Sequence, residues 1–259
     1  MDAIAPAALA QSLASERPPL VIDVRRNERF LESGHMIDGA LHRDPARVME
    51  WKKTLPAGAQ VVAYCVHGHE VSQNVAEALG ACYLEGGIEA WREMGGELFR
   101  KASGSATRWV TRERPKVDRI ACPWLIRRFI DPDAEFLYVS APDVKKIAAG
   151  REAAPYDIPD VHFSHEGERC SFDAFLRHFR LEADPALFEL AVIVRGADTN
   201  RMELAPQAAG LAALSLGLSR NFADDHEMLE QGMVMYDALY AWCRSGKEEI
   251  HTWNPSAYK

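Results

Sequence analysis

A single cysteine, Cys65, ends an apolar run in the segment QVVAYCVHGHEVSQNVAEALG, residues 60–80. The run, residues 61–64, is short enough to be a buried strand, and apolar residues at helical spacing follow the cysteine. In a parallel α/β sheet, ligands collect at the carboxyl ends of the strands, where the following helices present free backbone N–H groups. Such a position favours the thiolate, the form of cysteine that attacks sulfur or phosphorus. The pattern predicts a nucleophile at Cys65, and the alternative is a buried cysteine that only ends a strand.

The loop after Cys65 has residues that suit the binding of a small anion. Gly68 permits the backbone angles at which successive N–H groups curl round an anion or a terminal sulfur. The loop contains no arginine or lysine and instead carries His67, His69 and Glu70. The histidines could add positive charge when protonated or act as acid and base near the sulfur, or they could be exposed residues without a chemical role.

Three segments before residue 103 resemble the rhodanese family of sulfurtransferases. They are VIDVRRNERFLESGHMIDGALH (residues 21–42), the loop CVHGHEVS (65–72) and YLEGGIEAW (83–91). The resemblance implies a parallel sheet flanked by helices and a sulfane-sulfur carrier. In such a carrier Cys65 attacks a sulfur donor, holds the sulfur as a persulfide and passes it to a thiol or cyanide acceptor, and sulfur transfer requires no cofactor.

The resemblance also implies roles for residues near the cysteine. The loop amides would stabilise the terminal sulfur, and Arg25 and Glu28 would support the site by pairing with each other or with the loop, or would form only a surface ion pair. Related loops in dual-specificity phosphatases carry an arginine six residues after the nucleophile, where this chain has Val71, which argues against phosphatase or arsenate chemistry. The missing cation also argues against thiosulfate, a dianion, as the preferred donor. The predicted active-site loop comprises Val66, His67, Gly68, His69, Glu70 and Val71.

The second half resembles the C-terminal domain of the chromate-resistance protein B family from about residue 109 onward. The resemblance lies in RERPKVDRIACPWLIRRFIDPDAEFLYV (residues 112–139), FSHEGERCSF (163–172), Asp198 and FADDHEMLEQGMVMYDALYAW (222–242). The family name implies a link to chromate, to metals or to oxidative stress, including a sensing role.

This half also contains residue types that bind metals. Our favoured set for a divalent metal is His165, Asp198 and His226. The alternative for His226 is a place in the first turn of a long helix, next to acids that suit a helix N-terminus. Arg119 and Arg127 fall near the same face of a predicted helix, where they could hold an oxyanion or lie on a solvated face. The full set of candidate ligands is Asp118, His162, His165, Glu166, Cys170, Asp198, Asp225 and His226.

The elements that must position these residues divide the chain into two parts. The polar passage KASGSATR, residues 101–108, has no apolar period and marks the boundary. We predict a rhodanese-like α/β domain at 1–102, a linker at 103–112 and a mainly helical α+β domain at 113–259. The first contains a helix at 6–15 and strands at 20–24, 61–64 and 82–84, and the second contains helices at 117–130, 172–179, 185–194, 206–216 and 222–243 with short strands at 136–139 and 161–163.

Composition excludes several other classes of protein. The chain has 259 residues, 47% of them hydrophobic, and a net charge of -8. No long run of lysine and arginine is present, which argues against nucleic acid as the main partner. We expect no signal peptide and no membrane span. The five cysteines are dispersed, without a CxxC pair, as expected for reduced thiols in the cytoplasm.

Two functions from different classes agree with these features. The first is a cytoplasmic sulfurtransferase whose helical domain supplies an acceptor, a sensor or a metal site. The second is a chromate or oxidative-stress sensor with little turnover, in which a modified Cys65 changes the shape or the partners of the protein. A third hypothesis is metal-dependent redox chemistry in the helical domain.

Overall fold

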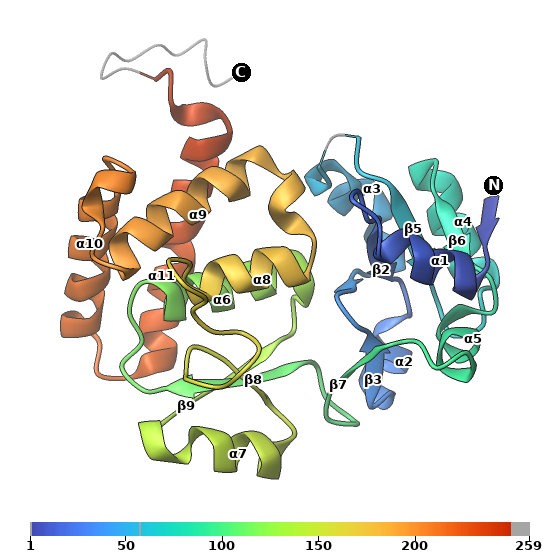
Figure 1. Cartoon of the computed structure of the whole chain (residues 1–259), viewed down its shortest axis with the longest axis horizontal. Helices are drawn as coiled ribbons and strands as arrows, with labels where there is room; N and C mark the ends of the chain where they lie inside the picture. The colour runs from blue at the N-terminus through green and yellow to red at the C-terminus, as the bar shows by residue number, and fades with distance from the viewer. Residues whose placement is uncertain (1, 57, 250–259) are drawn as a thin grey trace.

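A five-stranded parallel sheet forms the centre of the N-terminal domain in the computed structural model, which describes residues 2–56 and 58–249 (Figure 1). The strands lie in the order β1, β6, β5, β2 and β4, and every neighbouring pair is parallel. The strands predicted at 61–64 and 82–84 are confirmed, and the one predicted at 20–24 ends one residue earlier. The bounds are β1 Asp2–Ile4, β2 Leu20–Asp23, β4 Leu41–His42, β5 Val61–Tyr64 and β6 Cys82–Leu84.

Helices cover both faces of this sheet. Alternate residues of β2 and β5 belong to two separate apolar clusters, because successive side chains of a strand point to opposite faces. Leu9, Phe30 and Trp91 bring α1, α2 and α5 to one face, and Trp51 and Val75 bring α3 and α4 to the other. These helices span Pro6–Leu13 (α1), Asn27–Glu32 (α2), Val48–Trp51 (α3), Glu70–Leu79 (α4) and Gly87–Glu93 (α5), and a small antiparallel pair, β3 His35–Ile37 and β7 Leu98–Arg100, completes the domain.

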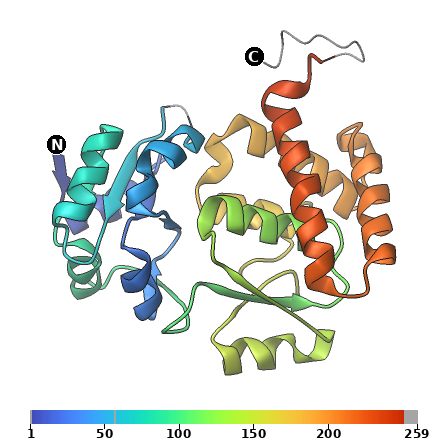
Figure 2. The same cartoon turned by 180° about the vertical axis from the view of Figure 1, so that it is seen from behind.

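The C-terminal domain packs α-helices against a small parallel sheet. Its strands lie in the order β10, β8 and β9, and Figure 2 shows its long last helix running along the side opposite to α8 and α9. Trp109 and Trp124, both fully buried, lie in its largest apolar cluster. The elements are β8 Arg108–Arg112, α6 Asp118–Leu125, β9 Glu135–Val139, α7 Val144–Arg151, β10 Ala154–Pro155, α8 Ser171–His178, α9 Pro185–Asp198, α10 Ala208–Asn221 and α11 Asp225–Ala241.

Two expectations for this half were wrong. Residues 108–112, expected in the linker, form β8, the central strand of the small sheet, because Trp109 and Val110 are fully buried against elements far along the chain. Residues 161–163, expected as a strand, form a turn, and Phe163 makes only a single bridge to Tyr156. Asp157 and Asp160 have positive φ values of 52° and 61° before this segment, so the chain bends instead of extending.

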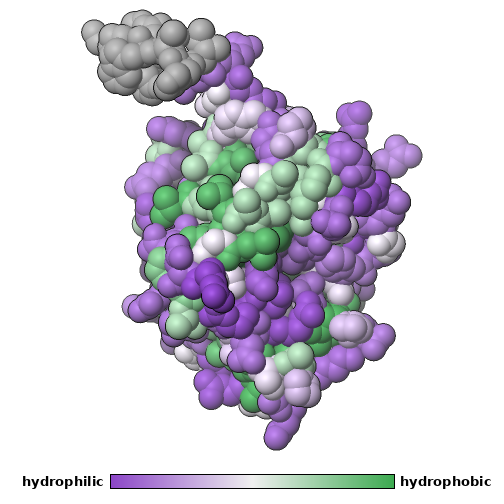
Figure 3. Space-filling model, turned by 90° about the vertical axis from the view of Figure 1, so that its left-hand side faces the viewer, coloured by the Kyte–Doolittle hydropathy of each residue, from purple (hydrophilic) through white to green (hydrophobic). Residues whose placement is uncertain are grey.

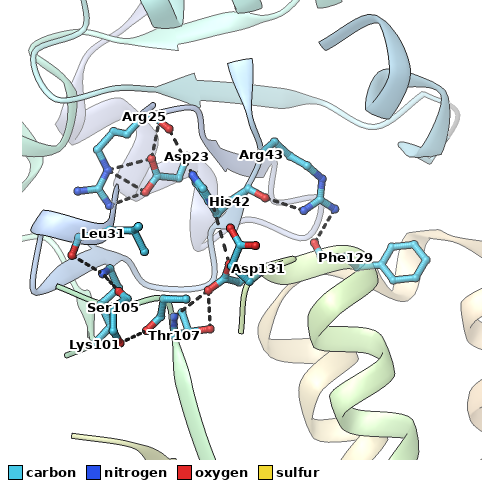
Figure 4. A network of polar contacts seen from close by, with 12 residues as sticks. Asp23, Arg25, Leu31, His42, Arg43, Lys101, Ser105, Thr107, Phe129 and Asp131 are labelled. Atoms are coloured by element: carbon cyan, nitrogen blue, oxygen red, sulfur yellow. Dashed lines mark hydrogen bonds and ion pairs between the residues drawn. The ribbon is translucent and has the colours of Figure 1, made fainter. Parts of the chain in front are cut away.

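A buried polar network joins the two domains (Figure 4). Arg43, just after β4, donates one hydrogen bond to the carbonyl of His42 and another, 2.7 Å long, across the interface to the carbonyl of Phe129. The ring of His42 has Nδ1 4.0 Å from Oδ1 of Asp131. The other oxygen of that carboxylate, Oδ2, accepts hydrogen bonds from the backbone and the hydroxyl of Thr107. Burial lowers the pKa of Arg43 to about 10. The interface therefore depends on specific polar contacts at the edge strand β4.

One face of the C-terminal domain carries exposed apolar side chains. Leu214 on α10 and Val234 on α11 are 60% and 65% exposed, and the groove between these helices has a volume of about 570 Å³. Figure 3 faces this side and shows apolar residues gathered on its surface. None of the helices in the described ranges is long and apolar enough to span a bilayer.

Candidate functional site

Cys65 lies at the carboxyl end of the parallel sheet, as the sequence predicted. It is the first residue after β5, and Glu70 and Val71 are the first two residues of α4. Cys65 is 7% exposed, and its Sγ lies 3.2 Å from the hydroxyl of the fully buried Ser72. That hydroxyl also lies 3.1 Å from the carbonyl of His69, so it can donate to the carbonyl or turn toward the sulfur. Ser72 is therefore positioned to stabilise a thiolate at Cys65.

The start of α5 holds the loop through two backbone hydrogen bonds. The backbone N–H groups of Ile88 and Glu89 donate to the carbonyls of Cys65 and Val66 at 3.0 and 3.2 Å. Gly87 has φ +60°, and a Cβ at this position would lie 2.5 Å from the Val66 carbonyl oxygen and closer still to that of Cys65. The glycine pair in the third rhodanese-like segment thus allows the two backbones to approach and fixes the direction of the loop carbonyls.

The loop presents backbone N–H groups without a cation. Among the hydrogen bonds recorded for residues 2–56 and 58–249, none uses the backbone N–H of Val66, His67, Gly68 or His69 as donor. Gly68 has φ +71°, the left-handed angle expected for a curled loop. The side chains of His67 and His69 are exposed, with ring centroids 5.9 Å apart. The loop can therefore offer hydrogen bonds to a small group of low charge.

Arg25 supports the fold of this region and does not pair with Glu28. Its guanidinium makes a forked, buried contact with Asp23, with Nε 2.9 Å from Oδ1 and Nη2 2.5 Å from Oδ2, and the Tyr64 hydroxyl donates to the same carboxylate. Burial alone would lower the pKa of Arg25, but Asp23 raises it above its usual value. Glu28 is exposed on α2. The alternative in which Arg25 pairs with Glu28 is wrong, because the guanidinium is bound by Asp23, two residues earlier in the chain.

A second cluster forms in the C-terminal domain around His165. Its Nε2 lies 3.1 Å from an oxygen of Asp198, 3.4 Å from one of Asp157 and 3.5 Å from one of Asp118. The Sγ of Cys170 lies within 4.8 Å of ligand atoms of Asp118 and Asp198. The residues come from separate elements: Asp118 begins α6, Asp198 ends α9, and the others lie in the loop between β10 and α8.

Burial and mutual repulsion perturb the ionisation of this cluster. Burial raises the pKa of Asp118 to about 7, although a hydrogen bond to His165 opposes the shift. Hydrogen bonds to the carboxylates, first that of Asp118, raise the pKa of His165 far above its usual value. Burial, and then the charge of Asp118, raise the pKa of the Cys170 thiol. Such strongly perturbed groups beside a cavity mark a candidate functional site.

His226 does not join this cluster. It is the second residue of α11, directly after Asp224, which caps the helix by accepting hydrogen bonds from the N–H groups of His226 and Glu227. Its ring packs edge-on against Tyr138, with centroids 5.3 Å apart. The structure therefore brings together His165 and Asp198 of the favoured set and places His226 where the alternative, a first-turn position, expected it.

Two other candidate ligands lie beside the cluster and have different partners. His162 Nε2 is 2.9 Å from His178 Nδ1, and His178 in turn lies 3.2 Å from a carboxylate oxygen of Asp38 in the N-terminal domain. Glu166 pairs with Arg177. Both line a cavity of about 390 Å³ that His165 also lines.

The arginines considered for an oxyanion are paired within the chain. Arg127 contacts Glu230 at 2.7 Å, and Arg119 contacts Asp157 at 3.1 Å. Sequence reasoning missed Asp157 as a member of the His165 cluster. The one available signal was a carboxylate eight residues before His165 in the same polar loop.

Comparison with known proteins identifies the N-terminal half. The rhodanese-like domain family matches residues 5–94. Among solved structures, a rhodanese-related protein from Thermoplasma volcanium is 23% identical, with 38% of this chain and 98% of that chain covered and a TM-score of 0.34. A rhodanese-like domain protein from Staphylococcus aureus is 24% identical, with 39% and 100% covered and a TM-score of 0.34. The expected α/β domain is confirmed.

The C-terminal half matches a second family over most of its length. The family described as ChrB, C-terminal domain, matches residues 109–243. Protein ChrB of Cupriavidus metallidurans is 36% identical over 132 residues, which are 51% of this chain, and the match spans 39% of the length of that relative. Both resemblances expected from the sequence are confirmed. The chain therefore belongs to the ChrB C-terminal domain family and carries a rhodanese-like domain ahead of it.

Proposed function

We propose that this protein is a sulfurtransferase in which Cys65 carries sulfane sulfur as a persulfide, coupled to a ChrB-type domain with a role in the response to chromate or oxidants. The observation that carries the proposal is the loop of unpaired backbone N–H groups around Cys65 at the carboxyl end of the sheet. These donors match the charge that a persulfide places on its outer sulfur.

The reaction requires two displacements at sulfur. The Cys65 thiolate attacks the outer sulfur of a donor R–S–S⁻ or R–SO₂–S⁻, forming the new S–S bond as the donor bond breaks and R–S⁻ or R–SO₂⁻ leaves with the electron pair. An acceptor thiolate or cyanide then attacks the outer sulfur, and Cys65 leaves as the thiolate. Ser72 is placed 3.2 Å from Sγ to stabilise that thiolate in both steps.

The loop also indicates a class of donor. Its amides supply hydrogen bonds, but the loop sequence has no arginine or lysine to balance a second negative charge. We therefore propose that singly charged donors, such as hydropersulfides and thiosulfonates, react faster than thiosulfate. The acceptor thiol must stay reduced, which is consistent with a place in the cytoplasm.

The competing function is a sensor with little turnover, and one observation favours considering it. The polar network of His42, Arg43, Phe129 and Asp131 links the carboxyl end of the sheet to the ChrB-type domain through buried contacts. A modification at that end of the sheet could alter the interface. A transferase would pass sulfur on and react again many times, whereas a sensor would stay modified at Cys65.

The deciding experiment is intact mass spectrometry after incubation with a hydropersulfide, a thiosulfonate or thiosulfate, followed by cyanide. Wild type should gain one sulfur, about 32 Da, and lose it to cyanide as thiocyanate over many cycles. Cys65→Ala should gain none, whereas the matched control Cys82→Ala, a half-buried cysteine on β6, should react like wild type. A stable adduct without repeated discharge would favour the sensor, and no adduct on Cys65 with any donor would exclude the transferase.

A further inference from the structure

The His165 cluster has the geometry of a coordination shell. One imidazole nitrogen, Nε2, faces oxygens of Asp118, Asp157 and Asp198 at 3.1 to 3.5 Å. A single N–H cannot donate well to three acceptors at once, because a hydrogen bond weakens steeply when it is far from linear. Ligands held about 2.1 Å from a common metal ion lie about 3.0 to 3.4 Å apart. The distances from Nε2 to the three oxygens are close to this range, and a ligand atom from each of His165, Asp118 and Asp157 lies within 4.8 Å of the others.

The charges in the cluster provide a second, independent reason. Arg112 and Arg119 both contact the same carboxylate, Asp157, at 2.7 and 3.1 Å. Asp118, 1% exposed, and Asp198 therefore share His165 as their cationic partner within the described residues, so a single imidazole faces two carboxylates that the arginines do not contact. Buried charges of one sign are costly unless a counter-charge is present.

The position of Asp198 strengthens the charge argument. It is the last residue of α9, where the helix dipole is negative and a carboxylate is disfavoured. Its side chain is only 14% exposed, and it faces the His165 nitrogen. A cation at this point would offset both the carboxylate and the dipole.

The cluster is open on one side. The side chain of His165 is 42% exposed and forms part of the wall of a cavity of about 390 Å³, together with Ser164, Glu166 and Arg177. Cys170, which lies near Asp118 and Asp198, is fully buried. An ion held here would keep a position that faces the cavity, as in sites that exchange a ligand.

We propose that Asp118, His165 and Asp198 bind a divalent first-row transition metal ion, with the Arg-paired Asp157 as an additional oxygen donor. Imidazole with carboxylates suits Zn²⁺ and Mn²⁺, and the buried thiol of Cys170 beside Asp118 and Asp198 adds a softer donor. His226, which the sequence suggested, has no part in this site.

The test is calorimetric titration of chelator-treated protein with Zn²⁺ and, separately, Mn²⁺. The titrations use the Cys65→Ala background, so that the thiol of the N-terminal loop cannot bind the metal. One equivalent should bind, and Asp198→Asn and His165→Gln should each weaken binding at least about 100-fold, more than the loss of an outer-sphere partner. His226→Ala is the matched control and should bind as the background does.

A second measurement separates a metal site from a purely structural ion network. Without metal, Asp198→Asn should unfold at the same temperature as its parent or higher, because it relieves repulsion in the cluster. Saturating metal should then raise the unfolding temperature of the parent by at least about 5 °C and leave that of the variant unchanged. A parent that binds neither ion, variants that bind like the parent, or a metal-free variant with a lower unfolding temperature would each overturn the proposal.

Discussion

Gly87→Ala is expected to disable the Cys65 loop without disrupting the rest of the fold. The added Cβ would meet the carbonyls of Cys65 and Val66 at about 2.5 Å, about 1 Å short of an ordinary contact, and both obstacles are backbone atoms. The left-handed φ of +60° adds about 1 to 2 kcal/mol of strain. We expect the loop to move by about 1 Å and sulfur transfer to fall about 100-fold, as misplaced reacting groups commonly cause.

Gly80→Ala is the matched control for this change. Gly80, at the end of α4, has φ +64°, and a Cβ there meets no atom within 4 Å, so it adds the same backbone strain without the clash. Gly80→Ala should lose about 1 to 2 kcal/mol of unfolding free energy in urea from strain alone. Gly87→Ala should lose at least as much, and only Gly87→Ala should lose activity. The rate at which iodoacetamide alkylates Cys65, followed by intact mass spectrometry, gives a second readout that does not depend on the sulfur donor. Equal reactivity of the two variants would refute the role assigned to α5 in holding the loop.

Two further predictions concern the junction of the domains. Arg43→Ala should lower the free energy of unfolding by about 2 to 4 kcal/mol, because the carbonyl of Phe129 loses a buried charged donor; urea titration measures this, and a loss below 0.5 kcal/mol would contradict it. Lys101 is 1% exposed, donates to the carbonyls of Leu31 and Ser105, and has its pKa lowered by burial from 10.5 to about 8. Between these values the folded state holds fewer protons than the unfolded state, so the contribution of Lys101 to stability rises with pH. The unfolding free energy of wild type, relative to that of Lys101→Met, should therefore rise from pH 7.5 to 10.5 by about 1 to 2 kcal/mol, and a difference independent of pH would show that the ammonium is not desolvated.

The N-terminal domain could be predicted from sequence because its chemistry is local. The residues that make the site, from β5 through the loop to α4, are contiguous, so the apolar run and the helical spacing indicated the strand and the helix around Cys65. The Arg25–Asp23 contact could not be derived in the same way. The Tyr64 hydroxyl from the adjacent strand helps to fix that carboxylate, and strand neighbours are not visible in the spacing of a single segment.

The C-terminal cluster could be predicted only in part because its members come from three separate segments. Residue type alone pointed to Asp118, His165 and Asp198, but nothing in their spacing showed that the start of α6 lies beside the end of α9. His226 has the same chemistry as His165, and only the packing of α11 against Tyr138 separates them. Ligand type can be read from a sequence, whereas convergence depends on tertiary contacts.

The two sites have opposite electrostatic character, and this difference constrains what each can bind. The loop at Cys65 presents N–H donors, and residues 66–69 contain no carboxylate, so it favours a group that carries negative charge. The cluster at His165 presents three carboxylates around one imidazole nitrogen, two of them without an arginine partner, so it favours a positive ion. A persulfide at the first site and a metal ion at the second are therefore consistent with the charges that each part of the chain leaves unbalanced. Exchanging the two ligands would place a negative group beside buried carboxylates and a cation among free N–H groups, and both arrangements would be unfavourable.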